Sequence, residues 1–319
     1  MSTSEPENLP SVSVIIPAFN EEKHIKATLT ALLETDYPKN LLDIIVVDNN
    51  STDSTADISK TLVSQVVILE EGHVGAVRNL GARLSNSEIL VFLDADCIVD
   101  EGWISRGVNL LETDRSLVCG GSYKARNNAN WVERLWLLEN PEHPKIQADL
   151  LGGCIFIRAE SFRSVGGFDE EMTSGEDSDL SVRLRESGNI IKIVPELSVI
   201  HLGNPSNFYT FIKRQIWHSE NYFRFINKSI RDYTFWMTLA FSTSSALFLF
   251  FLATKNYTPM GFSALMTIIL ASMLSAKRMF LTKYKPKRFY ELAGIFFIDY
   301  LYLSSRSIGL IKSLKPAKK

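Results

Sequence analysis

The chain of 319 residues has few cysteines and almost no excess charge. Its three cysteines, Cys97, Cys119 and Cys154, form no C-x-x-C pair and lack the density of a disulfide scaffold, so they fit a reducing compartment. The 34 Lys and Arg residues nearly balance the 36 Asp and Glu residues, which argues against a general nucleic-acid binder. Residues 1–10 are polar and acidic, with no apolar signal-peptide core, and we expect a disordered tail there.

Apolar residues are distributed unevenly, with a mixed first part and a strongly apolar C-terminal part. In the first part, short apolar runs alternate with amphipathic stretches. The runs predict strands at residues 12–16, 44–47, 66–69, 89–93, 118–124, 151–157 and 190–194, and the stretches predict helices at 20–33, 54–63, 75–84, 103–112 and 177–186. This alternation predicts an α/β fold with a mostly parallel sheet, right-handed crossovers and helices on both faces.

The predicted strand 89–93 runs directly into Asp94-Ala95-Asp96. Open α/β sheets bind ligands just beyond the carboxyl ends of their strands. Carboxylates are hard oxygen donors that suit Mg²⁺ or Mn²⁺ held jointly with substrate phosphates. A polar strand-to-loop junction has the same composition, because Asp is common in turns. His201, just past a later strand, is a candidate to complete a metal site or a hydrogen-bonded structural histidine.

Other polar residues follow the predicted strands. Asp48 ends the strand 44–47, where it can accept hydrogen bonds from a base or ribose, or cap the next turn. Arg78, near the start of the helix 75–84, can bind a diphosphate through its guanidinium or pair with a carboxylate. Gly152 and Gly153 permit close backbone approach to a donor sugar or acceptor.

Seven short motifs follow one another between Ser11 and Leu202. They are V-S-V-I-I-P-A-F-N-E-E, I-I-V-V-D-N-N-S-T-D-S-T, G-A-V-R-N-L-G-A, V-F-L-D-A-D, G-G-C-I-F-I-R-A-E, G-G-F-D-E and G-E-D-S-D-L-S-V-R-L. In this order they resemble the family-2 glycosyltransferases, inverting enzymes with a GT-A fold that use nucleotide sugars. The family often has D-D-x-S after its second strand, whereas this chain has Asp48-Asn49-Asn50-Ser51. The second acidic residue is therefore absent, and the identity of the nucleotide stays open.

The resemblance implies roles for individual positions. It implies that the nucleoside pocket is lined by Pro17, Ala18, Asn20, Glu21 and Asp48. It also implies that Arg78 lies near the diphosphate, and that Asp94 and Asp96 lie at the ribose, the diphosphate and the metal.

Gly175-Glu176-Asp177 opens the predicted helix 177–186. Transfer with inversion needs a general base that removes a proton from the acceptor hydroxyl as it attacks the anomeric carbon. A carboxylate at a loop-to-helix junction can serve, and the resemblance places the base at Asp177, with Glu176 beside it as a second catalytic candidate. The alternative is that these acidic residues only stabilise a helix N-terminus.

The C-terminal part predicts membrane attachment. Residues 235–254 and 258–276 are each about 20 mostly apolar residues, enough to cross a bilayer as a hairpin. Residues 207–231 mix aromatic and basic side chains, as in an amphipathic helix that lies in the membrane interface. Basic residues flank both spans, so the positive-inside rule predicts a cytosolic N-terminal domain. Residues 290–311 are interrupted by Asp299 and Arg306 and suit either an interfacial helix or a third span.

The expected organisation has five parts. They are a tail (1–10), a GT-A glycosyltransferase domain (11–205), an amphipathic interfacial helix (206–232), a transmembrane hairpin (233–278), and a basic cytosolic segment with an apolar interfacial or third membrane helix (279–319). We expect a multi-pass protein of the cytoplasmic (inner) membrane, whose cytosolic domain uses a nucleotide sugar and a divalent metal.

The acceptor is expected to be a lipid-linked saccharide or polysaccharide of the cell envelope, since the domain adjoins membrane lipids. Two alternatives remain. A polyprenyl-phosphate sugar synthase has a phosphate acceptor, which is already ionised and needs no base. A non-catalytic, nucleotide-sugar-binding scaffold of a polysaccharide assembly would be expected to lose Asp96 or Asp177, and both are present.

Overall fold

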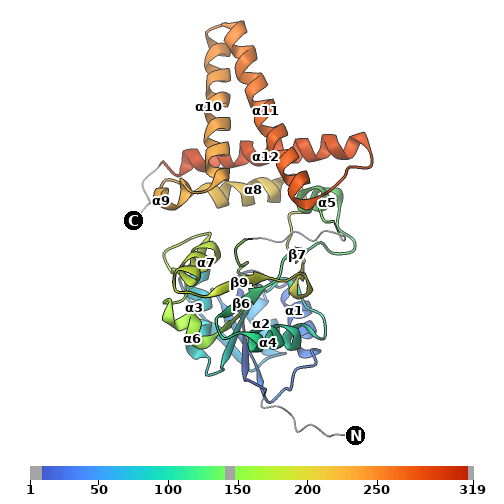
Figure 1. The fold of residues 1–319 in the computed structure, drawn as a ribbon, viewed down its shortest axis with the longest axis vertical. Helices are drawn as coiled ribbons and strands as arrows, with labels where there is room; N and C mark the ends of the chain where they lie inside the picture. The colour runs from blue at the N-terminus through green and yellow to red at the C-terminus, as the bar shows by residue number, and fades with distance from the viewer. Residues whose placement is uncertain (1–8, 141–147, 315–319) are drawn as a thin grey trace. The chain divides into compact units, whose positions relative to one another are not determined.

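The computed structural model describes residues 9–140 and 148–314. Most of the predicted tail and the last residues of the basic C-terminal segment therefore lie outside the described residues. The chain divides into two compact units. Among the described residues, the first contains 9–126 and 148–203, and the second contains 127–140 and 204–314. Figure 1 shows the elements of each unit.

The first unit is built on a seven-stranded sheet with the order β3-β2-β1-β4-β8-β6-β9. Its strands are β1 (Val12–Ala18), β2 (Leu42–Asp48), β3 (Gln65–Ile68), β4 (Ile89–Leu93), β6 (Leu117–Gly120), β8 (Cys154–Arg158) and β9 (Ile190–Ile193). Strand β8 runs antiparallel to its neighbours β4 and β6, and the other pairings are parallel. The prediction of a mostly parallel sheet is confirmed.

Strand β4 lies at the centre of the core, and all five of its residues are fully buried. Ile89, Val91 and Leu93 pack into one hydrophobic cluster, while Leu90 and Phe92 pack into another on the opposite face. A strand buried on both faces has a continuous apolar sequence, which explains why this run was so clear. Helices cover both faces of the sheet, as predicted.

The helices of the first unit are α1 (Ile25–Leu33), α2 (Thr55–Lys60), α3 (Val74–Leu84), α4 (Trp103–Thr113), α6 (Ala159–Ser164) and α7 (Glu176–Glu186), with a short 3-10 helix, η1 (Pro195–Leu197). Helices α1 and α4 share a cluster with Leu93, and α6 and α7 share a cluster with Phe92.

Helix α1 begins later than predicted. Asn20 has a left-handed φ of 55°, and its Oδ1 accepts a hydrogen bond from the Thr52 N–H at 2.9 Å. It therefore ties two loops together and does not cap the helix.

A second sheet joins three short strands in the order β5-β10-β7. They are β5 (Cys97–Ile98), β7 (Tyr123–Lys124) and β10 (Val199–His201). The predicted single strand 118–124 was wrong, because β6 and β7 belong to different sheets. The chain crosses between them at Gly121, where any Cβ would overlap the backbone of Leu197. The predicted strand 151–157 likewise starts late, at Cys154, after a turn through Gly152 and Gly153.

The second unit is helical. It contains α5 (Trp131–Leu137), α8 (Phe208–Ser219), α9 (Ile226–Ser229), α10 (Tyr233–Ala253), α11 (Tyr257–Thr282) and α12 (Phe289–Lys312). The helix predicted over 207–231 is divided, since α8 ends at Ser219 and α9 is a single turn. Within this unit, α10 and α11 form a hairpin, and α12 runs beside α8 across its base (Figure 1).

Two of the described helices, α10 and α11, are long and apolar enough to cross a membrane. Only 22% and 33% of their most apolar stretches are buried, so most of this apolar surface faces outward, unlike that of a core helix. Helix α10 begins two residues before the predicted span 235–254 and ends one residue before its end, whereas α11 extends the span 258–276 by one residue at its start and six at its end. Helix α12, with 24 residues, is long enough but is not apolar enough to be grouped with them.

Candidate active site

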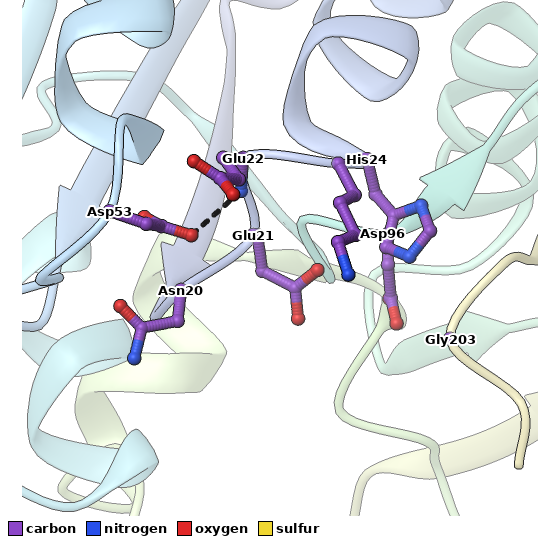
Figure 2. A pocket seen from close by; sticks show the side chains of 8 residues that line it. Asn20, Glu21, Glu22, His24, Asp53, Asp96 and Gly203 are labelled. Atoms are coloured by element: carbon purple, nitrogen blue, oxygen red, sulfur yellow. Dashed lines mark hydrogen bonds between the residues drawn. The ribbon is translucent and has the colours of Figure 1, made fainter.

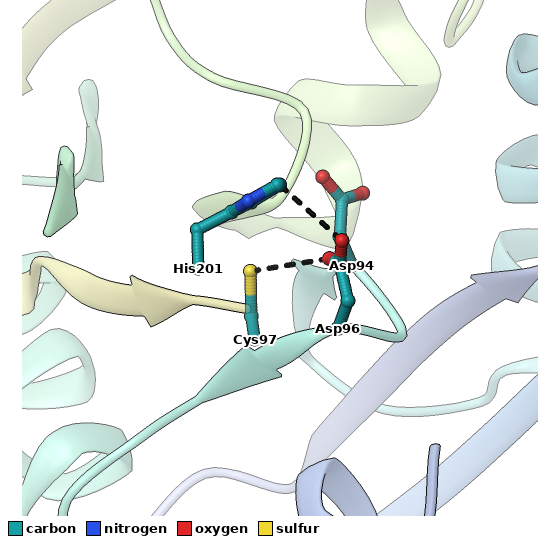
Figure 3. A group of neighbouring side chains, drawn as sticks. All are labelled: Asp94, Asp96, Cys97 and His201. Carbon is teal, nitrogen blue, oxygen red and sulfur yellow. Dashed lines mark hydrogen bonds and ion pairs between the residues drawn. The ribbon is translucent and has the colours of Figure 1, made fainter. Parts of the chain in front are cut away.

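Four potential ligand side chains converge beyond the end of β4. Asp94, Asp96, Cys97 and His201 bring their ligand atoms within 4.8 Å of one another (Figure 3). Strand β10 supplies His201 by pairing it with Cys97 of β5, and His201 Nε2 lies 3.5 Å from Asp96 Oδ2. Two carboxylates and an imidazole suit Mg²⁺ or Mn²⁺, so the residues present fit a divalent cation.

Sequence reasoning missed Cys97, although it follows Asp96 directly. The thiol is fully buried and donates a weak hydrogen bond to Asp96 Oδ1 at 3.8 Å. Burial, reinforced by the charges of Asp94 and Asp96, raises the pKa of this thiol well above its ordinary value. Cys97 is therefore a protonated neighbour of the two carboxylates.

Asp94 is held from both sides. Arg78 Nη2 donates to Asp94 Oδ1 at 2.8 Å, and the Tyr123 hydroxyl donates to Asp94 Oδ2 at 2.8 Å. Burial acts to raise the pKa of Asp94, but the Arg78 charge and these hydrogen bonds outweigh it and keep the pKa below its ordinary value. Asp94 is thus an ionised carboxylate with a fixed orientation.

Gly152 and Gly153 leave room for this arrangement. A Cβ on Gly153 would overlap Asp94 Oδ2 and lie 2.6 Å from the Tyr123 hydroxyl oxygen. A Cβ on Gly152 would lie 2.5 Å from Arg78 Nη2. We predicted close approach of these glycines to a sugar or an acceptor. The structure shows that the side chains of Arg78, Asp94 and Tyr123 already occupy the space beside these glycines.

Arg78 of α3 is almost completely buried and binds two carboxylates. Besides Asp94, it holds Glu176, with Nη1 donating to Oε1 at 2.6 Å. Its guanidinium carbon also lies 5.4 Å from the ring centre of Phe168. The predicted contact between Arg78 and a diphosphate stays a prediction, and the partnership with Glu176 had no sequence signal.

Asp177 lies in the first turn of α7, beside Glu176. Its Oδ2 accepts a hydrogen bond from the Gly152 N–H at 3.1 Å, and its Oδ1 accepts one from the Ser178 N–H at 2.8 Å. Burial and then the charge of Glu176 raise the pKa of Asp177 to about 6, against the opposing effect of Arg78. A carboxylate with this pKa is mostly ionised at pH 7 and is more basic than a normal aspartate, as general-base chemistry requires.

A cavity of about 360 Å³ opens beside Asp96, one of the four ligand side chains (Figure 2). It is lined by Asn20, Glu21, Glu22, Lys23, His24, Asp53, Asp96 and Gly203. The structure thus brings two of the predicted nucleoside residues, Asn20 and Glu21, to the same cavity as Asp96. Sequence reasoning missed Lys23 and His24, although both directly follow the motif N-E-E.

Three predicted nucleoside residues do not line this cavity. Pro17 and Ala18 end β1, paired with Val47 and Asp48 of β2. Asp48 is 1% exposed, and its two carboxylate oxygens accept hydrogen bonds from Ser51, at 2.9 Å from N and 2.6 Å from Oγ. The turn-forming role that we considered for Asp48 is present. Its role toward a nucleoside stays a prediction.

Comparison with known proteins identifies the domain. Residues 13–165 match the family described as "Glycosyl transferase family 2". These residues form a family 2 glycosyltransferase domain. They include most of β1, all of β2 to β4 and Asp94-Ala95-Asp96, whereas Asp177 and His201 lie beyond the matched range.

Two relatives illustrate the breadth of the family. The glycosyltransferase AglE of Haloferax volcanii is 29% identical over 65% of this chain and 71% of its own length. The poly(ribitol-phosphate) beta-glucosyltransferase of Bacillus spizizenii is 30% identical over 41% of this chain but only 22% of its own length. The name of the second relative gives poly(ribitol-phosphate) as its acceptor, and the matching region makes up only a small part of that protein.

A solved structure shares the fold. The mannosyltransferase PcManGT from Pyrobaculum calidifontis, in complex with GDP-Man and Mn²⁺, superposes with a TM-score of 0.61 at 20% identity. The alignment covers 98% of this chain and 90% of that chain. The GT-A fold predicted from the motifs is confirmed, and the two apolar C-terminal helices fit membrane anchoring.

Proposed function

We propose that the chain is an inverting glycosyltransferase that moves a sugar from a nucleotide-sugar donor to a membrane-associated acceptor, with Asp177 as the general base. The observation that carries the proposal is the position of Asp177. Its carboxylate has a pKa of about 6 and accepts a hydrogen bond from Gly152, next to the Gly153 that faces Asp94. A base with raised basicity thus stands close to the residues proposed to bind the leaving group.

The remaining residues have distinct roles in the proposal. Asp94, Asp96 and His201 would hold Mg²⁺ or Mn²⁺, which neutralises charge on the leaving diphosphate when it is bound. Asn20 and Glu21, which line the cavity, would contact the nucleoside. Glu176 adjusts the basicity of Asp177, and Arg78 keeps Asp94 ionised and oriented.

The proposed acceptor is a lipid-linked saccharide or a polysaccharide at the membrane. Helices α10 and α11 provide the proposed anchor, because their outward surface is apolar. Lys277 and Arg278 near the end of α11, together with Arg231 before α10, favour a cytosolic glycosyltransferase domain at the inner membrane. The poly(ribitol-phosphate) named for the Bacillus spizizenii relative supports a polymeric acceptor.

The test uses membranes that contain the full-length chain. They are incubated with a panel of nucleotide sugars and Mn²⁺ or Mg²⁺, with and without added lipid extract, and released nucleoside diphosphate is measured. We expect one donor to release nucleoside diphosphate faster when the lipid extract is present. Membranes that contain Asp177→Asn provide the matched control. Equal release from both membranes, or no dependence on any donor, would overturn the proposal.

A further inference from the structure

Two arginines of the second unit, Arg278 and Arg306, have different kinds of partner. Arg278 of α11 forms an ion pair with Asp299 of α12, whose Oδ2 also accepts a hydrogen bond from the Ser275 hydroxyl at 2.7 Å. Arg278 donates further hydrogen bonds to the carbonyl oxygens of Leu135 and Trp136 in α5. This arginine therefore joins three helices, and its charge is neutralised within the protein.

Arg306 of α12 has no such carboxylate. Its Nη1 donates to the Tyr222 hydroxyl, and its guanidinium carbon lies 4.7 Å from the ring centre of Tyr302 and 5.8 Å from that of Tyr222. Its Nε is buried without a hydrogen-bond partner. Within residues 9–140 and 148–314, no acidic side chain forms an ion pair with Arg306. Asp232, whose Oδ1 accepts a hydrogen bond from the Thr234 N–H at the start of α10, attracts Arg306 electrostatically but forms no ion pair with it among these residues.

Arg306 lies in a firmly packed part of the second unit. His218 of α8 has a pKa lowered to about 3 by burial and by the charges of Arg306 and Arg214, so it is neutral at pH 7. One turn after Arg306, a Cβ on Gly309 would overlap Ser219 of α8, which shows that the two helices are in close contact. Arg306 is held in place while part of its side chain stays accessible.

We propose that Arg306, together with Tyr222, binds the phosphate group of a membrane lipid. A charged guanidinium on an apolar helix is costly without a counter-ion, and residues of this kind usually mark functional sites in membrane proteins. The planar donor fork of arginine matches phosphate oxygens, and Tyr222 already orients one end of that fork. Exposed apolar side chains on α12, including Phe297 and Ile308, provide surface for the lipid chains.

Two kinds of lipid carry this phosphate: the phospholipids of the bilayer and a polyprenyl phosphate that serves as an acceptor or carrier. The inference rests on the membrane attachment proposed above and does not depend on glycosyl transfer. Failure of one proposal is therefore distinguishable from failure of the other. Nucleoside diphosphate release from the donor reports on the first unit, and lipid binding reports on Arg306.

The test is lipid binding by the purified full-length chain in a non-ionic detergent, measured by native mass spectrometry. The chain is titrated with a polyprenyl monophosphate, with the matching polyprenol that lacks phosphate, and with phosphatidylglycerol. Arg306→Gln removes the charge, and Arg306→Lys keeps it without the planar fork. Arg288→Gln is the matched control, because Arg288 is an exposed arginine that stacks on Tyr290 at the start of the same helix.

We expect the wild type to prefer the polyprenyl phosphate over the polyprenol by at least about 10-fold, the value of one charge-assisted hydrogen bond. Arg306→Gln should abolish the preference, Arg306→Lys should retain part of it, and Arg288→Gln should leave it unchanged. Effective competition by phosphatidylglycerol supports a general headgroup site, and weak competition supports recognition of a polyprenyl phosphate.

Two results would overturn the inference. One is equal binding of the polyprenyl monophosphate and the polyprenol by the wild type. The other is a preference for the polyprenyl monophosphate that is unchanged in Arg306→Gln. Thermal unfolding and donor hydrolysis are measured on each variant to confirm that both units are folded. If Arg306→Gln does not fold, the Arg306→Lys variant tests the inference instead. An unchanged preference for the polyprenyl monophosphate in a folded lysine variant would contradict a role for the planar fork.

Discussion

Arg78 and Glu176 lie 98 positions apart in the sequence and form a buried ion pair, with 2.6 Å between Nη1 and Oε1. The same guanidinium binds Asp94 at 2.8 Å. One side chain therefore connects the end of β4 to the start of α7, where Asp177 lies. The proposed base and the first carboxylate of Asp94-Ala95-Asp96 belong to one electrostatic network, and changes in one are expected to affect the other.

The first prediction concerns Asp177→Asn, which keeps the size of the side chain but removes its basicity. Turnover should fall by at least ~100-fold, while donor affinity stays nearly unchanged. Both quantities are measured on the same purified protein, with Asp179→Asn as a control in the same helix, where Asp179 pairs with Arg183. Lost donor binding would assign Asp177 to the nucleotide pocket. Near-normal turnover would favour the polyprenyl-phosphate synthase, whose acceptor needs no base.

The second prediction concerns pH. A base works in its ionised form, so kcat/KM should be full above the pKa of Asp177, about 6, and should fall as the pH drops through that value. Glu176→Gln removes a negative charge that raises this pKa, and the acidic limb should therefore move to lower pH. The measurement is the pH profile of both proteins. A midpoint that is unchanged, or that moves upward, would contradict the coupling of the two carboxylates.

The third prediction concerns the metal. Excess chelator should inactivate the wild type, and added Mn²⁺ or Mg²⁺ should restore it. Asp96→Ala should be inactive with or without metal and should bind the donor more weakly. Asp100→Ala, which removes an exposed carboxylate paired with Arg106, is the control and should keep its activity. Full activity of the wild type in excess chelator would rule out a role for the metal.

The fourth prediction concerns Gly153→Ala. The new methyl group would overlap Asp94 Oδ2 and crowd the Tyr123 hydroxyl, so it should displace Asp94 and weaken donor binding by about 10-fold or more. Gly261→Ala is the control, because the new methyl group there meets nothing within 4 Å outside its own helix backbone and chain neighbours. Donor affinity and thermal unfolding are measured for both. Equal donor affinity in the two variants would show that Asp94 does not depend on Gly153.

The fifth prediction concerns the ion pair between Arg278 and Asp299. Asp299→Asn leaves the guanidinium without its counter-ion, and breaking a buried pair from one side costs about 3–5 kcal/mol. The variant should therefore unfold at a clearly lower temperature in detergent. Replacing both residues, Arg278→Met with Asp299→Leu, removes both charges and should restore much of the loss. A double variant less stable than the single one would contradict this account.

Local patterns determined much of the fold in advance. The run at residues 89–93 predicted β4 with its correct bounds, because a strand buried on both faces must be apolar at every position. The two apolar stretches predicted α10 and α11 for a similar reason, since a bilayer requires length and composition alone. Asp94 and Asp96 were found together because they are adjacent to that strand in the chain.

Contacts between distant segments were decided only by the tertiary structure. The pairing of Arg78 with Glu176 depends on how α3 and α7 approach each other, and no pattern near either residue encodes it. Cys97 joins His201 only because β5 and β10 pair in a separate small sheet. Asp299 and Arg306 interrupt the same apolar stretch, yet one has an arginine partner and the other has no described counter-ion. Composition records that both residues are charged, whereas packing determines which charge is neutralised, because the energy of a charge depends on the atoms around it.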